Sequence, residues 1–179
     1  KNTMYHGSNT KFDRFEPKAH MLSGDDRVVF GTPLRAMAVA GMGRWNDDDF
    51  EQGTYNDEDL LHMRELRPGA LESTYRGKRG YLYEMDPESF ERGSDAYMPT
   101  EYISKTSPKI LKRVEVDAYE AMLAEEKAGR MKIHRMQKAA ALNTDVQLRP
   151  HQEAALGVLG TGGRAIFAHG TGTGKTLTS

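Results

Sequence analysis

The chain has 179 residues, of which 37% are hydrophobic and 28% charged, and its formal net charge is −1 at pH 7. This composition is that of a soluble globular protein of one domain plus a fragment, and the balanced charge gives no general attraction for nucleic acid. Because there is no cysteine, disulfides, thiolate nucleophiles and cysteine-ligated zinc are excluded, and no apolar run reaches the roughly 20 residues that a bilayer requires.

The N-terminus lacks the charged and then apolar layout of a signal peptide. We therefore expect no membrane association and a cytoplasmic protein. The chain begins at Lys1 rather than Met, and it stops at Ser179, shortly after a phosphate-binding motif. We expect it to be a piece of a longer protein.

Short strands separated by turns are predicted over the first two thirds of the chain. The apolar stretch at 27–30 ends in a turn, and the small residues at 36–40 follow as a short helix, with Thr32 as its cap and Pro33 as its first residue. The other predicted strands are 3–8, 81–85, 101–104 and 110–116. Many strands with few helices predict a mixed, mostly antiparallel α+β domain.

The segment at 41–80 has a looser pattern. Acidic clusters occur at 46–49 and 57–59, and 60–66 has the pattern of a short helix. The clusters lack the spacing of a calcium-binding loop, so a solvated, mobile insertion is favoured over a metal site. Such an insertion is also a candidate lid.

A helical pattern runs from 117 to about 142, and Gly129 is expected to break or weaken it. It carries the only local cluster of basic residues, which favours a solvated helix face, with a nucleic-acid contact as the alternative. We place a domain boundary between 125 and 145. The members of this cluster are Lys127, Arg130, Lys132, His134, Arg135 and Lys138.

Three residues in the strand-rich part suggest a binding cleft. His6 stands at the end of one strand, Glu101 at the start of another, and Phe30 ends a strand between them. Such a cleft suits a ribose with an aromatic leaving group. The carboxylate would stabilise positive charge on the sugar, the imidazole would hold a hydroxyl, and the aromatic face would stack on the leaving group. From spacing alone, a structural histidine and a surface glutamate are the favoured alternative.

These residues lie in motifs that resemble a known family. Tyr5-His6-Gly7-Ser8 resembles the first motif of the diphtheria-toxin-like and poly(ADP-ribose)-polymerase-like ADP-ribosyltransferases. The strand at 28–32 with its Ala-rich helix resembles their second motif, and Glu101-Tyr102-Ile103 resembles their third. The three motifs occur in the family's order between residue 3 and about residue 120.

The resemblance implies an NAD-dependent transferase that moves ADP-ribose onto a protein or nucleic-acid acceptor. Its catalytic residues would be His6, which binds the nicotinamide ribose, and Glu101, which stabilises the oxocarbenium-like ribose and activates the acceptor. The Gly7 backbone would hold the nicotinamide carboxamide. The full set of NAD-binding residues would be Tyr5, His6, Gly7, Ser8, Phe30 and Thr32.

The chain departs from the family in its second motif. The family usually has a tyrosine where this chain has Phe30, and a second tyrosine where it has Gly41 or Met42. Phe30 can stack on a nicotinamide ring but has no group that forms a hydrogen bond. The alternative function is therefore a helicase-associated ADP-ribosyltransferase-like domain that binds with weak or no turnover.

A second motif of different chemistry closes the chain. An apolar strand at 164–168 leads into a glycine-rich loop, whose Gly172 and Gly174 let backbone N–H groups surround the phosphates of ATP. Lys175 would reach the β and γ phosphates, and the Thr176 hydroxyl would ligate Mg²⁺.

This loop resembles that of superfamily 2 helicases, and the segment at 148–152 resembles their upstream motif, in which Gln152 would contact adenine. The chain stops before an acidic Mg²⁺-binding motif, so we expect no productive ATP hydrolysis. The longer protein would act on DNA, as in multi-domain proteins that phages and mobile elements deliver into a host cytoplasm.

Three regions are thus predicted. Residues 1–125 form an ADP-ribosyltransferase-like domain with a split, mostly antiparallel sheet. Residues 126–145 form a basic helical linker. Residues 146–179 form the first strand and P-loop of an α/β helicase ATPase domain.

Overall fold

The computed structural model describes residues 2–20, 23, 25–44, 46–55, 59–93 and 100–138. Its strands form three small sheets. The first has the order β1 (Met4–Ser8), β6 (Arg79–Met85), β9 (Ile110–Asp117). The second has the order β2 (Lys18–Ala19), β3 (Arg27–Gly31), β8 (Tyr102–Ser104), β7 (Phe90–Arg92). The third has the order β10 (Met131–His134), β5 (Leu61–Glu65), β4 (Phe50–Gly53).

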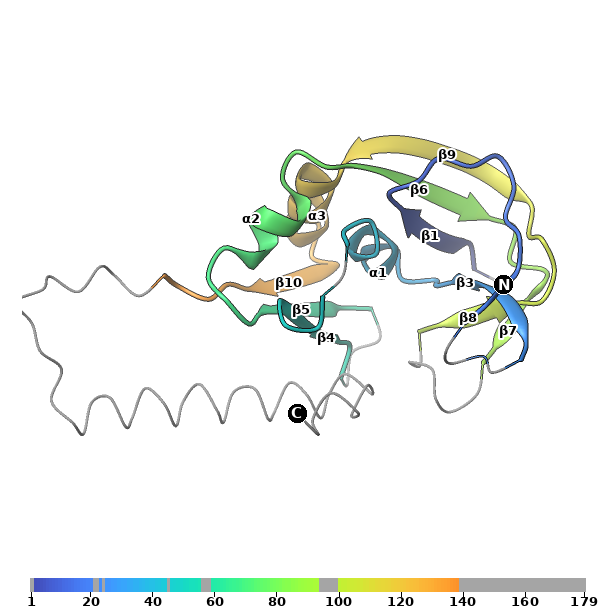
Figure 1. Ribbon diagram of the computed structural model, residues 1–179, viewed down its shortest axis with the longest axis horizontal. Helices are drawn as coiled ribbons and strands as arrows, with labels where there is room; N and C mark the ends of the chain where they lie inside the picture. Colours follow the sequence, from blue (N-terminus) through green and yellow to red (C-terminus); the bar gives the residue numbers. More distant parts are fainter. Residues whose placement is uncertain are drawn as a thin grey trace, which may run out of the picture.

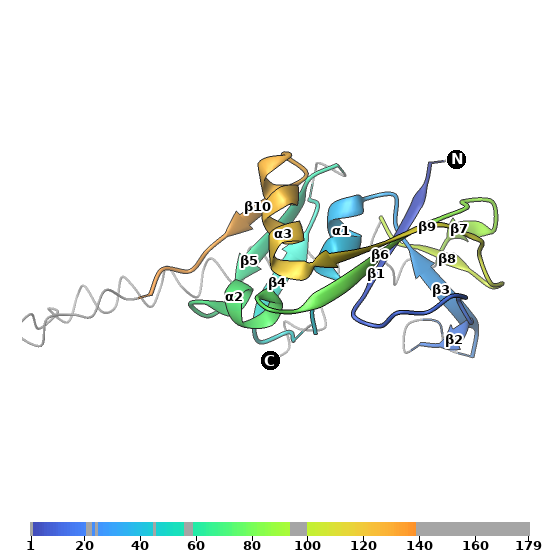
Figure 2. The same ribbon diagram turned by 90° about the horizontal axis from the view of Figure 1, so that it is seen from above.

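The prediction of a mixed, mostly antiparallel α+β fold is confirmed. Among the described strands, β10 and β5 form the single parallel pair. In the described part of the chain, three short helices accompany the sheets: α1 (Arg35–Ala40), α2 (Ala70–Tyr75) and α3 (Ala118–Lys127). Figures 1 and 2 place the four-stranded sheet at one end of the molecule and α2 and α3 at the other.

A short bridge joins the first and second sheets. The Tyr5 N–H donates to the Thr32 carbonyl at 2.8 Å, and the Thr32 N–H donates to the Tyr5 carbonyl at 3.0 Å. The chain leaves β3 at this bridge and enters α1. The first two motifs of the predicted site are therefore held together by backbone hydrogen bonds.

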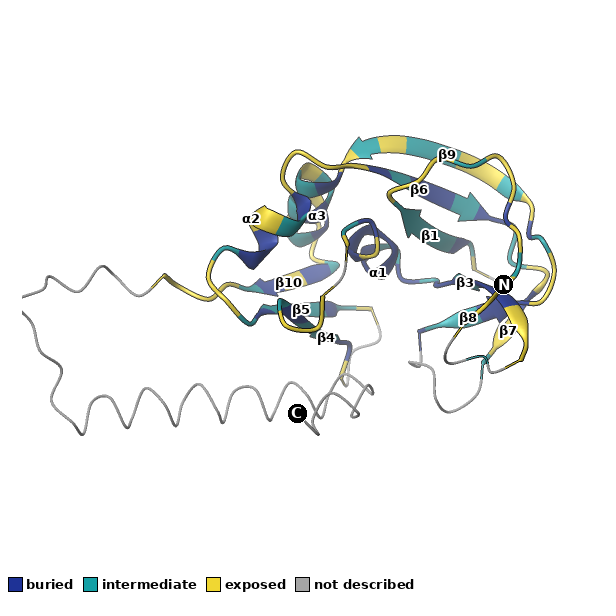
Figure 3. Ribbon diagram, in the orientation of Figure 1, coloured by how far each residue is buried: buried dark blue, intermediate teal, exposed yellow. Residues whose placement is uncertain are grey.

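Helix α1 lies at the centre of the fold, between the β1–β6–β9 sheet and the β4–β5–β10 sheet (Figure 1). Every residue from Ala36 to Ala40 is buried, which Figure 3 shows as a dark blue helix. Four of these side chains are alanine or valine, so neighbouring backbones can approach the helix closely. This helix therefore forms the main core with residues of both sheets, α2 and α3.

The start of α1 differs from the prediction. The helix begins at Arg35, its N-cap residue is Leu34, and no side chain caps it. The Thr32 hydroxyl instead accepts a hydrogen bond from the Leu34 N–H at 3.0 Å, within the turn that precedes the helix. Thr32 is thus a turn residue, and Pro33 lies before the cap and not at the first helical position.

The segment at 41–80 is largely part of the core, so the prediction of a mobile insertion is wrong for its described strands and helix. Residues 61–65 form a strand and not the predicted helix, with Leu61 and Met63 fully buried. Tyr75 of α2 is also fully buried, and its hydroxyl donates to the Ala40 carbonyl at 2.6 Å. This bond ties the segment to the end of α1.

The helical pattern predicted from 117 to about 142 does break at Gly129, but the prediction that it continues as helix after this residue is wrong for the described residues. Helix α3 ends at Lys127, and Gly129 has a φ of 78°, in the left-handed region that ends many helices. Residues 131–134 then form β10, which pairs with β5 and buries Met131 and Ile133. At these positions the predicted helical linker is instead a strand of the core. Residues 139–145 lie outside the described part.

Two buried carboxylates hold the end of the fold in place. The Glu125 side chain is 1% exposed and accepts from the Arg130 guanidinium at 2.6 and 3.0 Å, while Arg35 of α1 lies 3.1 Å away. Glu65 accepts from the backbone N–H groups of Leu71 and Met136, each at 2.9 Å. These bonds attach β10 and the residues after it to α1, α2 and α3.

Candidate functional site

A cavity of about 220 Å³ brings together most of the predicted NAD-binding residues. Its wall is built from β1, the end of β3, α1, β4 and the residue before β8. The predicted residues in the wall are Tyr5, His6, Gly7, Phe30, Thr32 and Glu101, and the others are Gly31, Met37, Ala38, Ala40, Gly41 and Gln52.

Aromatic side chains and one carbonyl fix the orientation of His6. Its Nδ1 lies 2.8 Å from the Phe30 carbonyl oxygen, and its ring makes an edge contact with Phe15 at a centroid distance of 5.0 Å. Because a carbonyl oxygen only accepts, Nδ1 carries the proton and Nε2 is left as a hydrogen-bond acceptor. Burial lowers the pKa of His6 below 6.5, partly offset by the bond to Phe30, so the ring is neutral at pH 7.

Gly7 lies where β1 meets α1. A Cβ atom at this position would lie 1.7 Å from the Ala38 carbonyl oxygen, so no larger residue fits without moving the helix. In an antiparallel pair, the backbone N–H and C=O groups of successive residues point to opposite sides of a strand, so those of residues i and i+2 point to the same side. The backbone N–H and C=O groups of Tyr5 bond to Thr32, on the side of β1 that faces away from β6. The backbone groups of Gly7 point to the same side of β1, two residues after this bridge. They face the cavity that Gly7 lines.

Phe30 and Thr32 have mainly structural contacts in addition to lining the cavity. The Phe30 ring is partly buried and makes an edge contact with His20 at 4.7 Å, and its carbonyl holds His6. Thr32 is buried, its backbone bridges to Tyr5, and its hydroxyl accepts from Leu34. Phe30 therefore contributes an aromatic ring without a polar group to the cavity wall.

Glu101 directly precedes β8 and reaches the cavity because β8 pairs with β3. Tyr102 lies opposite Gly31 in this pair, which places Glu101 beside the end of the Phe30 strand. The preceding residue, Thr100, is buried, and its hydroxyl donates to the Met37 sulfur of α1 at 3.4 Å. Glu101 is partly buried and is thus positioned by both a strand and a helix.

Ser8 was predicted to bind NAD, but it does not line this cavity. Its hydroxyl oxygen accepts a hydrogen bond from the Thr10 N–H at 3.1 Å and supports the turn after β1. Ser8 lies opposite Tyr81 at the far end of the β1–β6 pair. The hydroxyl therefore shapes a turn in this structure.

Gln52 is a residue of the cavity wall that the sequence motifs did not indicate. It lies on β4, opposite Met63 of β5, in a segment without resemblance to the family. Its Oε1 atom is buried and accepts no hydrogen bond from any described residue. No local signal in the sequence marks it, because its place in the site depends on the β4–β5 pairing.

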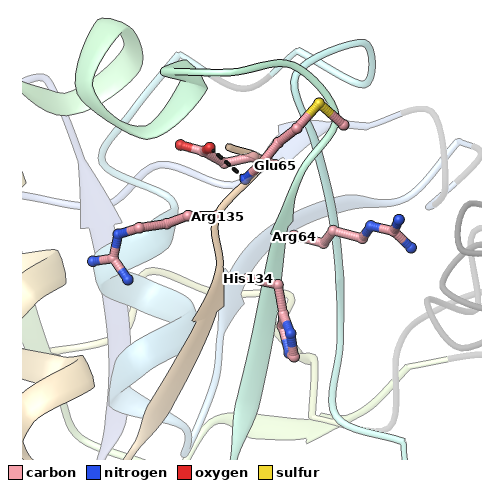
Figure 4. A pocket seen from close by; sticks show the side chains of 5 residues that line it. Arg64, Glu65, His134 and Arg135 are labelled. Carbon is pink, nitrogen blue, oxygen red and sulfur yellow. Dashed lines mark hydrogen bonds between the residues drawn. The ribbon is translucent and has the colours of Figure 1, made fainter. Parts of the chain in front are cut away.

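A second cavity of about 310 Å³ lies at the end of β10 and is shown in Figure 4. Arg64, Glu65, His134, Arg135 and Met136 line it. The guanidinium groups of Arg64 and Arg135 point away from each other (Figure 4), so they do not converge on one anion. Both Glu65 oxygens are used by backbone N–H groups. This cavity has no arrangement of groups that suggests a reaction.

Several side chains of the predicted basic cluster form hydrogen bonds or ion pairs within the fold. Arg135 pairs with Glu126 through two bonds of 2.8 Å, and Arg130 pairs with Glu125. His134 lies 3.0 Å from His62, nitrogen to nitrogen, with the rings stacked. The lysines of the cluster, Lys127, Lys132 and Lys138, are exposed.

The described residues contain no group of three or more His, Asp or Glu side chains arranged to hold a metal ion. In the acidic cluster at 46–49, Asp49 pairs with the Arg67 guanidinium at 2.6 Å. The predicted ATP and Mg²⁺ site, made of Gln152, Gly172, Gly174, Lys175 and Thr176, lies outside the described residues.

Among the described residues there is no helix with the length and apolar character needed to cross a membrane. No protein-family model matches the chain, and neither curated proteins nor solved structures show a significant match to it.

Proposed function

We propose that residues 1–138 form an NAD-dependent ADP-ribosyltransferase that modifies a macromolecular acceptor. The observation that supports it most is that His6 and Glu101, which are far apart in the sequence, line one cavity together with Phe30. Their convergence is what a shared binding site requires.

The groups around the cavity suit cleavage of a nicotinamide–ribose bond. Neutral His6 offers Nε2 to a ribose hydroxyl, and the apolar face of Phe30 suits a nicotinamide ring. The backbone N–H and C=O of Gly7 suit the carboxamide. The direction of the His6 ring follows from its hydrogen bond to Phe30, and that of the Gly7 backbone groups follows from the alternation along β1.

Glu101 is proposed as the catalytic residue. As the C–N bond to nicotinamide breaks, the electron pair leaves with nicotinamide and positive charge grows on the ribose. The Glu101 carboxylate stabilises this charge. A nucleophilic group of the acceptor then forms the new bond to the ribose carbon, and its proton passes to Glu101.

The test is transfer of label from NAD to candidate protein and nucleic-acid acceptors by the full chain. We expect Glu101→Ala to lower the transfer rate by about 10²–10³-fold with little change in stability. Glu91→Ala is the matched control, because Glu91 is an exposed glutamate on β7, the strand next to β8. Transfer that survives Glu101→Ala unchanged would remove Glu101 from the mechanism.

A binding domain without turnover is the second candidate, and Phe30 favours it because the ring supplies no hydroxyl to the cavity. This candidate predicts that NAD binds to the chain while no acceptor is labelled. Calorimetric titration with NAD, beside the labelling assay, separates the two functions.

The helicase function proposed for the longer protein rests on the sequence motifs at 148–152 and 169–176. ATP with Mg²⁺ at 100 times its dissociation constant should stabilise the domain that binds it by about 2.7 kcal/mol. A thermal shift with ATP that disappears in Lys175→Ala would support the P-loop, and strong ATP hydrolysis by this chain would contradict the expected lack of a complete ATPase site.

A further inference from the structure

Strand β9 has one edge that pairs with no other described strand. It lies at the end of the sheet order β1–β6–β9, at the top of Figure 1, and its only partner among the described strands is β6. With eight residues it is the longest described strand. It also carries Leu111, whose exposed fraction of 54% is the highest among the exposed large hydrophobic residues of the described part. A long edge of this kind is a surface on which a further strand can pair.

The alternation of backbone groups through the sheet shows which residues of β9 face this outer edge. The Gly7 backbone groups point away from β6, so those of its partner Leu82 point to the other side of β6, towards β9. Leu82 lies opposite Val114, whose backbone groups therefore bond to β6. The backbone groups of the two neighbours, Arg113 and Glu115, consequently face the outer edge.

A second copy of β9 fits this edge in one antiparallel register. A two-fold axis through Val114, perpendicular to the sheet, places Arg113 of each copy opposite Glu115 of the other. The backbone groups of these two pairs would face each other, and the paired side chains have opposite charges. Registers centred on Arg113 or on Glu115 would instead place like charges opposite each other. The charges therefore favour the register centred on Val114.

The ion pairs that β9 already makes are compatible with this register. Arg113 lies 2.7 Å from Asp13, and Glu115 lies 3.2 Å from Arg79. In the paired copies, Asp13 and Arg113 of one chain would be followed by Glu115 and Arg79 of the second copy, so that the sign of the charge alternates along the row. Asp13 and Arg79 are exposed. Solvated charges of this kind determine the register more than they add affinity, so we expect a weak, reversible association.

We propose that two copies of this chain associate through the outer edges of β9, with two-fold symmetry about Val114. The two three-stranded sheets would then form one sheet of six strands. The cavity with His6 is lined by β1, at the opposite edge of the β1–β6–β9 sheet, so both cavities would remain open. This inference is independent of the proposed function.

Sedimentation velocity of the full chain at increasing concentration tests the association. We expect the weight-average mass to rise from that of the monomer towards that of the dimer. Glu115→Arg places arginine opposite Arg113 in both pairs, and Arg113→Glu places glutamate opposite Glu115. Each variant should associate at least about 10-fold more weakly. An equimolar mixture of the two variants restores opposite charges in both pairs and should associate as strongly as the wild type.

Glu115→Pro is a test that does not depend on charge reversal. It removes an N–H that faces the outer edge and no hydrogen bond to β6, so it should weaken association while the chain still folds. Glu91→Arg is the matched control, because it makes the same charge change on β7, the edge strand of another sheet, and should leave association unchanged. Circular dichroism checks that each variant is folded.

Two results would overturn the inference. One is a wild-type chain that stays monomeric up to about 1 mM, a concentration at which even a dissociation constant of this size gives a large dimer fraction. The other is association of Glu115→Arg and Glu115→Pro with the dissociation constant of the wild type. These two variants decide the question even if Arg113→Glu unfolds after losing its bond to Asp13.

Discussion

His6 is a neutral hydrogen-bond acceptor because of its surroundings. The Phe30 carbonyl requires the proton on Nδ1, and burial lowers the pKa of the ring below 6.5. We predict that NAD affinity is constant from about pH 8 to 6.5 and declines at lower pH, because protonation of Nε2 removes the acceptor for the ribose hydroxyl. Calorimetric titrations at a series of pH values measure this decline.

The free energy of unfolding should change in the same direction. The unfolded chain takes up this proton near pH 6.5 and the folded chain only at lower pH, so the His6 contribution is complete above 6.5 and is lost as the pH falls through the folded pKa. His6→Ala should abolish the pH dependence of NAD binding in this window. A decline centred above pH 6.5 in the wild type would contradict the assignment.

Gly7 is predicted to be essential for folding independently of any ligand. In Gly7→Ala, the new methyl group would collide with the Ala38 carbonyl oxygen, a backbone atom that cannot rotate away. We expect the free energy of unfolding to fall by about 2–3 kcal/mol. Denaturant unfolding followed by circular dichroism measures the change.

Gly41→Ala provides the comparison for this substitution. Gly41 lies at the end of α1 with ordinary helical backbone angles, and a Cβ atom there would approach the Ala38 oxygen to 3.3 Å. We expect a change below about 1 kcal/mol, because small shifts relieve this contact. Equal effects of the two substitutions would argue against close packing of α1 on β1.

Among the elements, α3 depends on a buried charge. Glu125 is almost fully buried between the guanidinium groups of Arg130 and Arg35. Glu125→Ala leaves two arginines without their carboxylate, and we expect a loss of about 3–5 kcal/mol in the free energy of unfolding. The neighbouring pair of Glu126 and Arg135 is more exposed, so Glu126→Ala should cost less than about 1 kcal/mol. Thermal unfolding of both variants tests the contrast.

The elements differed in how well the sequence predicted them. Strands at 3–8, 27–30, 81–85, 101–104 and 110–116 were predicted because turn residues bound them, and the structure has a strand at each place, as β1, β3, β6, β8 and β9. Both strands of the parallel pair, β5 and β10, were predicted as helix. Each alternates apolar and polar residues, the pattern of a strand, but each is short and lies beside a helical segment. Their pairing joins residues too far apart in sequence for a local pattern to show it.

At the scale of the whole molecule, the fold includes residues beyond 125, and its described contacts extend into the range 125–145 in which the domain boundary was predicted. Strand β10 pairs with one edge of β5, and the Met136 backbone N–H donates a hydrogen bond to the buried Glu65 carboxylate. We predict that a chain ending at residue 138 unfolds cooperatively, whereas a chain ending at residue 128 does not, because it exposes Leu61 and Met63 and leaves Glu125 without Arg130. Circular dichroism during heating distinguishes them, and cooperative unfolding of the shorter chain would contradict the prediction.

The sequence predicted part of the site and not the rest. Motifs on β1, on β3 and before β8 indicated His6, Phe30 and Glu101, and these residues do line one cavity. Gln52 was not indicated, because a lone glutamine on an unrecognised strand has no local signature. Ser8 was predicted from its motif, but its hydroxyl supports a turn. A motif shows which residue types follow one another along the chain. Which of them line the cavity depends on the pairing of strands that are far apart in the sequence, and a motif does not show this pairing.

The contact between Gly7 and the Ala38 carbonyl has a consequence for comparing homologues. The glycine is required by the meeting of a strand and a helix, so selection for folding alone would preserve it. Under the proposed transferase function, a descendant without transfer activity would keep Gly7 and α1 while the residue at position 101 changed. A glycine at position 7 of related sequences would then indicate a shared fold, and the residue at position 101 would indicate whether the proposed reaction is retained.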